Sequence, residues 1–148
     1  MDHALAVVDA TETAKELVRE AGELAAGVDA ELTLLHVTTE DEYQDKADAM
    51  AAIPDVDATY TFEQAVDGAE RFADDVGRSV LDGVDVSYDA VGRLGDRGDT
   101  VLDVARESGA DHVFVAGRKR SPTGKALFGD VTQRIILDFD GAVTVVTS

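Results

Sequence analysis

The sequence predicts a single α/β domain, residues 1–148, built on a doubly wound sheet of five parallel strands. Two observations carry this prediction. Five short apolar runs, rich in valine, leucine and alanine, are separated by stretches in which apolar residues recur with helical spacing. The chain of 148 residues has the length of one ordinary domain with a full core.

The first unit is strand, helix, strand. Ala4–Val8 is a continuous apolar run, as expected for a parallel strand buried on both faces. A helix with one apolar face follows and ends near Gly27, and Glu31–Val37 is the second strand. Two strands joined by a helix in this way form a right-handed crossover unit.

The segment Thr38–Thr59 is acidic and only weakly periodic. It predicts a long excursion from the sheet with a single helical turn around Asp45–Ala51. Two interpretations stay open, a lid over a site and an ordinary surface insertion.

The middle of the chain predicts a long helix, a strand and a shorter helix. Thr61–Leu81 is strongly amphipathic, with Phe62 counted on its apolar face, and Val84–Val91 alternates as a third strand. A turn at Gly92–Gly98 leads to a helix at Thr100–Glu107, which Gly109 ends.

The last third predicts two more strands with a helix between them. His112–Ala116 is the fourth strand, Asp130–Phe139 a helix and Ala142–Val146 the closing strand.

The charge of the chain excludes some function classes. With 31 acidic against 13 basic residues, the formal charge is -18, which argues against general binding of nucleic acid. The acidity resembles that of proteins from halophiles that accumulate salt. No apolar run approaches the roughly 20 residues of a membrane span, and the N-terminus lacks a signal-peptide pattern, so we expect a cytoplasmic location and no membrane partner.

One stretch departs from this acidity. His112–Gly129 contains no Asp or Glu but four of the basic residues, Arg118, Lys119, Arg120 and Lys125. A positive loop between the carboxyl end of a strand and the amino end of a helix is where α/β proteins hold anions. The stretch predicts an anion site; a solvated basic loop is the alternative.

Four pieces of sequence, in order, resemble the universal stress protein family over nearly the whole length: AVVDATETAKELV, LTLLHV, GDTVLDVARESGADHVFVAG and GDVTQRIILDFDGAVTVV. The resemblance implies a Rossmann-like fold of the adenine nucleotide alpha hydrolase type. It also implies a stress-response or signalling protein that binds an adenine nucleotide, such as ATP with Mg²⁺. It further implies a homodimer that pairs through the last strand, at Val143, Thr144, Val145 and Val146.

The same resemblance assigns roles to residues. Asp9 would hold the nucleoside end, and the backbone of Val37 would contact the base. The family's phosphate motif begins at Gly117 and ends at Gly129, and the site extends to Asp130, Val131 and Thr132. The motif is altered, because Arg120 stands in place of its second glycine, the spacer is one residue short and Asp130 replaces a hydroxyl residue.

These departures have physical consequences. Arginine at 120 limits the close approach of the backbone to a phosphate and adds a long cation instead. Asp130 with Gln133 has the pattern of a capping box, which would place a carboxylate at the helix end that a phosphate needs. We therefore expect a phosphate to be held by basic side chains, or no ligand at all. Thr132 is the remaining hydroxyl near this helix start.

Several residues have competing interpretations. Asp9 with Glu12 also has the pattern of a capping box, so Asp9 either binds a ligand or starts the first helix. Thr123-Gly124-Lys125 lacks the spacing of a P-loop. His3, His36 and His112 lack the spacing of metal ligands, and we interpret them as structural.

The leading hypothesis is a nucleotide-binding stress-response protein. A ligand-free interaction module on the same fold stays open. The glycine-rich loop after the first strand that a nucleotidyl-transfer enzyme needs is absent, and the final VTVVTS lacks the lysine of a response-regulator receiver. No nucleophile–base pair can be assembled, so we predict no catalytic residues and at most weak ATP hydrolysis.

Overall fold

The computed structural model describes residues 1–54, 59–118 and 128–147, and it confirms the predicted α/β fold. Five parallel strands form one sheet in the order β3-β2-β1-β4-β5. The strands are β1 His3–Val7, β2 Glu31–Thr38, β3 Tyr88–Leu94, β4 His112–Gly117 and β5 Ala142–Thr147. The helices are α1 Glu12–Gly27, α2 Glu40–Ala51, α3 Phe62–Val80, α4 Arg97–Ser108 and α5 Asp130–Asp138. None of the helices in the described ranges is long and apolar enough to cross a membrane.

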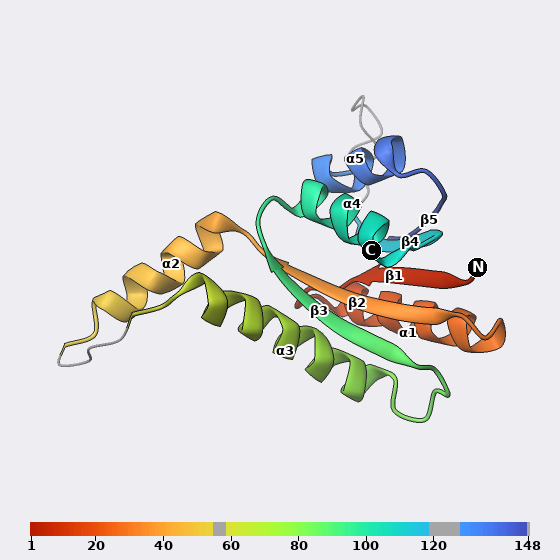
Figure 1. Cartoon of the computed structure of the whole chain (residues 1–148), viewed down its shortest axis with the longest axis horizontal. Coiled ribbons are helices and arrows are strands. Elements are labelled where there is room, and N and C mark those ends of the chain that lie inside the picture. Colours follow the sequence, from red (N-terminus) through yellow and green to blue (C-terminus); the bar gives the residue numbers. More distant parts are fainter. Residues whose placement is uncertain (55–58, 119–127, 148) are drawn as a thin grey trace.

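The helices cover the two faces of the sheet in pairs. Helices α1 and α3 lie on one face, and α4 and α5 lie on the other (Figure 1). Each pair closes its own apolar cluster over the shared strands, with Leu17 and Phe114 in the first cluster and Val101 and Ile135 in the second. This two-sided burial explains why β1, β2 and β4 are continuous apolar runs in the sequence.

The winding of the chain reverses beside β1. From β1 the chain runs outward through β2 to β3, and it then returns to the other side of β1 with β4 and β5. In sheets of this kind, ligands bind beyond the carboxyl ends of the strands at the point of reversal. Here that point lies between β1 and β4.

The third strand is displaced from its predicted position. Val84 and Val86 alternate like strand residues, but they lie before the strand, in a connection that packs on the α1–α3 cluster. Pairing with β2 begins where Leu32 meets Tyr88 and continues to Thr38 with Leu94. The prediction of Val84–Val91 was therefore wrong at both ends, because the neighbouring strand sets the register.

The predicted turn Gly92–Gly98 was also wrong. Its first three residues belong to β3, and α4 begins at Arg97 rather than at Thr100. Asp96 caps α4 by accepting a hydrogen bond from the backbone N–H of Asp99 at 2.9 Å. Gly109 ends the helix with a left-handed backbone of φ 71°, as predicted.

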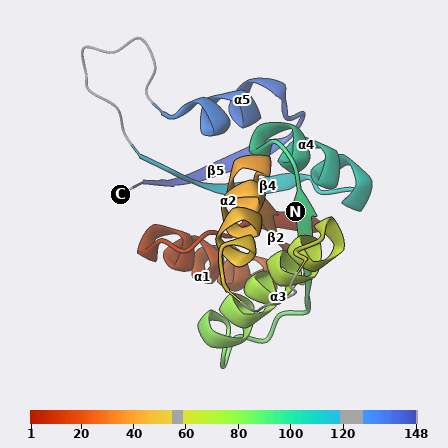
Figure 2. The same cartoon turned by 90° about the vertical axis from the view of Figure 1, so that its left-hand side faces the viewer.

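The acidic excursion contains a complete helix, where the sequence predicted a single turn at Asp45–Ala51. Helix α2 spans twelve residues and projects from the sheet between the two helix layers (Figures 1 and 2). None of its residues is buried, which is why the sequence shows little periodicity. Local interactions form it instead, namely a complete capping box of Thr39 and Glu42 and acidic residues in the first turn.

An aromatic cluster holds α2 against the start of α3. The Tyr43 ring stacks on Tyr60 with centroids 5.3 Å apart, and its hydroxyl donates to the Tyr60 carbonyl at 2.7 Å. The Tyr43 ring also packs against the Phe62 ring, with centroids 4.7 Å apart. Phe62, predicted on the apolar face of α3, is 61% exposed and belongs to this cluster rather than to the core.

His112 links the last two strands and makes stability depend on pH. Its Nε2 lies 2.7 Å from the Thr144 hydroxyl on β5. Burial lowers the pKa of His112, although the nearby Asp111 carboxylate opposes the shift. Because the folded-state pKa lies below the unfolded value of about 6.5, the stabilising contribution is complete above that pH and is lost as the pH falls through the folded-state pKa.

We therefore expect the melting temperature to fall between about pH 7 and pH 5, with a shallower fall for His112→Gln. Thermal unfolding followed by circular dichroism at several pH values measures both slopes. Identical slopes for the two proteins would show that His112 does not contribute.

Candidate functional site

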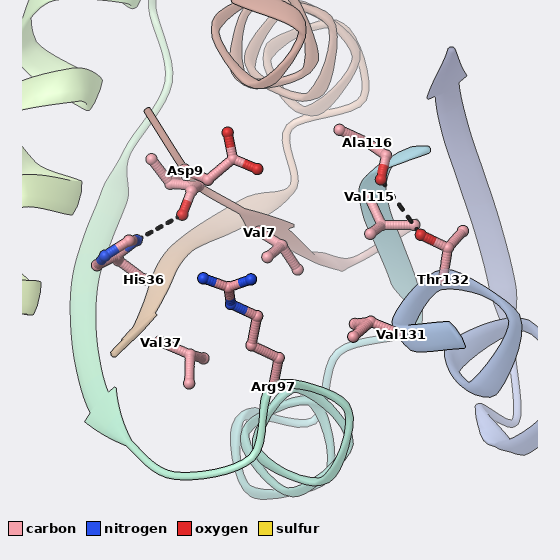
Figure 3. A pocket seen from close by; sticks show the side chains of 10 residues that line it. Val7, Asp9, His36, Val37, Arg97, Val115, Ala116, Val131 and Thr132 are labelled. Carbon is pink, nitrogen blue, oxygen red and sulfur yellow. Dashed lines mark hydrogen bonds between the residues drawn. The ribbon is translucent and has the colours of Figure 1, made fainter. Parts of the chain in front are cut away.

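The carboxyl ends of β1, β2 and β4 surround a cavity of about 160 Å³ at the reversal point, which we call the inner hollow. Its walls come from the sheet and from the first turns of α4 and α5 (Figure 3). Most of the wall is apolar, and polar groups stand at a few places. The lining residues are Val7, Val8, Asp9, His36, Val37, Arg97, Val115, Ala116, Val131 and Thr132.

A second cavity of about 270 Å³, the outer hollow, adjoins the first. It is lined by Asp9, Thr11, Thr13, Ala116, Gly117 and Arg118. The two hollows share Asp9 and Ala116 in their walls, so they lie next to each other. Neither alone reaches the roughly 300 Å³ at the lower end of small-molecule sites, but together they do.

Asp9 lies at the junction of the hollows and does not cap α1. The cap is Thr11, whose hydroxyl oxygen accepts a hydrogen bond from the Ala14 N–H at 3.1 Å. Asp9 Oδ1 in turn accepts bonds from the Thr11 N–H at 2.8 Å and the Thr11 hydroxyl at 2.6 Å. The capping box predicted for Asp9 and Glu12 was wrong, and the carboxylate instead fixes the loop that leads into the helix.

The end of β2 supplies two residues of the inner hollow. Val37 is 3% exposed and packs in the α4–α5 cluster. His36 Nδ1 lies 2.7 Å from the Val8 carbonyl. Because a carbonyl can only accept, Nδ1 carries the hydrogen, and a neutral ring then presents Nε2 as an acceptor. The His36 ring also packs against Phe72 of α3 at 4.6 Å.

Gly117 ends β4 at the outer hollow, where a side chain would not fit. A Cβ atom there would lie 2.8 Å from Val145 Cγ1 and 3.1 Å from Phe128 Cδ1. The glycine therefore lets β5 and the approach to α5 pack closely against β4. This packing role is sufficient to explain the first glycine of the predicted phosphate motif.

Helix α5 begins at Asp130, as predicted, but it is capped differently. Gly129 is its N-cap, with no side-chain hydrogen bond, and Asp130 is its first helical residue. The capping box predicted for Asp130 and Gln133 was therefore wrong, because the helix includes Asp130. The exposed carboxylate of Asp130 still lies in the first turn, where the positive end of the helix favours negative charge.

Val131 and Thr132 bring the first turn of α5 to the inner hollow. Thr132 is 5% exposed, and its hydroxyl donates to the Ala116 carbonyl at 3.3 Å. Its proton is therefore already used, and the hydroxyl could serve a ligand only as an acceptor.

The structure thus brings together Asp9, Val37, Val131 and Thr132 at the inner hollow and Gly117 and Arg118 at the outer one. Gly129 and Asp130 stand at the adjoining helix start. Lys119, Arg120 and Lys125 lie outside the described residues. Among the described residues, no group of three or more His, Asp or Glu side chains could hold a metal ion.

Sequence reasoning missed several lining residues, among them His36 and Arg97, whose side chains carry polar groups into the wall of the inner hollow. The signal for His36 was present, since it precedes Val37 at the end of a strand that points at the site. Arg97 had no such signal, because the predicted start of its helix lay three residues later.

A comparison with protein families matches residues 1–147 to the universal stress protein family. The chain belongs to this family. No curated protein matches the sequence.

Solved structures of universal stress proteins share the fold. UspA from Lactobacillus plantarum is 19% identical, with a TM-score of 0.69, over 98% of this chain and 97% of that one. The universal stress protein from Archaeoglobus fulgidus, solved in complex with dAMP, is 17% identical, with a TM-score of 0.62, over 99% and 97%. A universal stress protein in complex with cAMP is 18% identical, with a TM-score of 0.62, over 99% and 96%. At these identities the likeness shows the fold.

Proposed function

We propose that this universal stress protein binds an adenine nucleotide at the carboxyl ends of β1, β2 and β4. The base occupies the inner hollow, the ribose lies beside Asp9, and the phosphates extend through the outer hollow toward α5. The protein acts by binding in a stress response or in signalling, and not by turnover.

The observation that carries this proposal is the pair of adjoining hollows and the contrast between them. The inner hollow has apolar walls of valine with few polar groups, which suits a planar base. The outer hollow adds the Thr13 side chain and the Arg118 cation, which suit phosphate oxygens. Asp9 stands between them, where a carboxylate can accept hydrogen bonds from ribose hydroxyls.

The structural neighbours that bind dAMP and cAMP support adenine as the base. For the phosphates, we propose Arg118 together with Lys119, Arg120 and Lys125, because these cations follow β4 directly in the sequence. The first turn of α5 adds N–H groups that no side chain caps among the described residues. With ATP, a Mg²⁺ ion would accompany the phosphates.

A ligand-free interaction module is the second candidate. It is favoured by the carboxylate of Asp130 in the first turn of α5, where it competes with a phosphate. The packing role of Gly117 also removes one reason to expect a phosphate loop.

Calorimetric titration with AMP, ADP and ATP separates the two candidates. We expect heat for the wild type, and affinity about tenfold weaker for Asp9→Asn, which loses charged hydrogen bonds to the ribose. Asp103→Asn, an exposed acid on α4 away from both hollows, is the matched control and should bind like the wild type.

Asp130→Ser should bind up to about fivefold more tightly, because it removes a like charge from the helix end. Absence of heat with all three nucleotides, for both the wild type and Asp130→Ser, would leave the ligand-free module as the better account.

We also propose that the protein is a cytoplasmic, single-domain homodimer adapted to high salt. With a formal charge of -18, repulsion between carboxylates destabilises the fold where salt does not screen it. The melting temperature should therefore rise from about 0.1 M to molar potassium chloride, beyond the range of simple Debye screening. A flat profile would contradict the adaptation to salt.

A further inference from the structure

Arg97 places a cation in the wall of the inner hollow. It is the first residue of α4, and its side chain extends from the helix toward Val7 (Figure 3). It lines the inner hollow but not the outer one. A ligand that places its base in the inner hollow would meet this guanidinium, while its phosphates would lie elsewhere.

Glu42 of the projecting helix α2 holds this guanidinium. Arg97 Nη2 donates to Glu42 Oε1 at 2.8 Å. The carboxylate is itself fixed, since Oε1 accepts hydrogen bonds from the Thr39 hydroxyl at 3.0 Å and the Thr39 N–H at 3.2 Å. The carboxylate that completes the capping box of α2 therefore also binds the guanidinium that lines the inner hollow.

The Arg97–Glu42 pair adds little to stability but favours one orientation of the Arg97 side chain. Both side chains are 48% exposed, and ion pairs in such positions are worth little because water screens them. Burial raises the pKa of Glu42, but the bonds from Thr39 and the charge of Arg97 outweigh it, so that the pKa lies below its usual value. Glu42 therefore stays charged at neutral pH and remains paired with Arg97.

The chemistry of the wall indicates what Arg97 would contact. The valines beside it present methyl groups, which attract a base only through burial. A guanidinium is planar and weakly hydrated, and it packs well against the face of an aromatic ring. Lysine at the same place would supply the charge without the planar contact.

We propose that Arg97 is a base-contacting residue of the nucleotide site and that Glu42 positions it by their direct hydrogen bond. This inference rests on the proposed function and extends it: affinity depends on an aromatic base in the inner hollow, and α2 takes part in ligand binding through a single carboxylate.

The test compares a ligand that has a base with one that lacks it. Titrations of the full-length protein with AMP and with ribose 5-phosphate, followed by NMR so that weak binding is measured, give the ratio of the two affinities. Arg97→Ala should weaken AMP binding about threefold to thirtyfold, the range for a cation against an aromatic ring. It should leave the affinity for ribose 5-phosphate unchanged.

Three further variants sharpen the result. Arg97→Lys should lose most of the AMP preference, since charge alone does not replace the planar contact. Glu42→Gln keeps the capping box of α2 but weakens the hydrogen bond to Arg97. The ratio of the affinities for AMP and ribose 5-phosphate should therefore fall by a smaller factor than in Arg97→Ala. Arg106→Ala, at the other end of α4 and paired with Asp103, is the control and should leave the ratio unchanged.

Equal losses for AMP and ribose 5-phosphate in Arg97→Ala would place the guanidinium on the phosphate and overturn the inference while the proposed function stands. An unchanged ratio in Arg97→Ala would overturn it as well. A wild type that binds neither compound would refute the proposed function and this inference together.

Discussion

Replacing Gly92 with alanine should destabilise the fold by about 3 kcal/mol, the upper end of the range for overpacking a core. Gly92 lies inside β3, opposite His36 of β2, and α3 crosses it. A Cβ atom there would collide with the backbone N of Glu70 and the backbone O of Val66, and it would lie 2.9 Å from Ala69 C. Backbone atoms inside a helix cannot move aside as the end of a flexible side chain can.

Chemical denaturation of the wild type and Gly92→Ala measures the difference in unfolding free energy. Gly68→Ala is the matched control. Gly68 lies in α3, the helix that crosses Gly92, and no atom lies within 4 Å of a Cβ added to it. Alanine there should stabilise the protein by up to about 1 kcal/mol. Equal stabilities of the wild type and Gly92→Ala would show that α3 does not approach β3 so closely.

Val145→Lys should convert the proposed homodimer into a monomer. Strand β5 is the last strand of the sheet order, and it has no charge and no proline from Ala142 to Thr147. Such an edge favours pairing with a second copy of itself about a two-fold axis. Two unpaired lysines at the centre of that interface should weaken it by about 3 kcal/mol or more, roughly a hundredfold.

Sedimentation at high salt measures the mass of each variant. Val145 also packs in the α4–α5 cluster, so circular dichroism must show that the lysine variant is folded. Ile53→Lys, which replaces a 49% exposed apolar side chain just after α2, is the control and should remain dimeric. A wild type that sediments as a monomer would refute the dimer without any variant.

The parts of the fold that burial determines could be predicted from the sequence. Strands β1, β2, β4 and β5 and helices α1, α3 and α5 carry apolar patterns long enough to identify, and their bounds differ from the prediction by only one or two residues. Alternating strands and helices then predict the parallel sheet, which the structure confirms.

The errors arose where tertiary contacts or local capping decide the structure. Gly92 has the local signature of a turn, and only the crossing of α3 explains why a strand needs glycine there. Helix α2 buries no residue, so periodicity could not reveal it, whereas Thr39 and Glu42 already had the spacing of a capping box.

The part of the site that lies at the carboxyl ends of the strands could be predicted from the sequence. Asp9 and Val37 could be placed together because parallel strands end at the same edge. Arg97 could not, since its position depends on where α4 starts and on Glu42, 55 residues earlier in the chain. Whether a long side chain at a helix start reaches the site depends on tertiary packing, and the pattern of apolar residues in the sequence does not reveal that packing.

Methyl NMR of valine-labelled protein during titration with AMP shows whether a nucleotide base enters the inner hollow. We expect the methyl signals of Val7, Val37, Val115 and Val131 to shift, while those of Val76, Val80 and Val84 on the other face of the sheet stay in place. Shifts confined to other valines, or no shifts at saturating AMP, would show that the base does not enter the inner hollow.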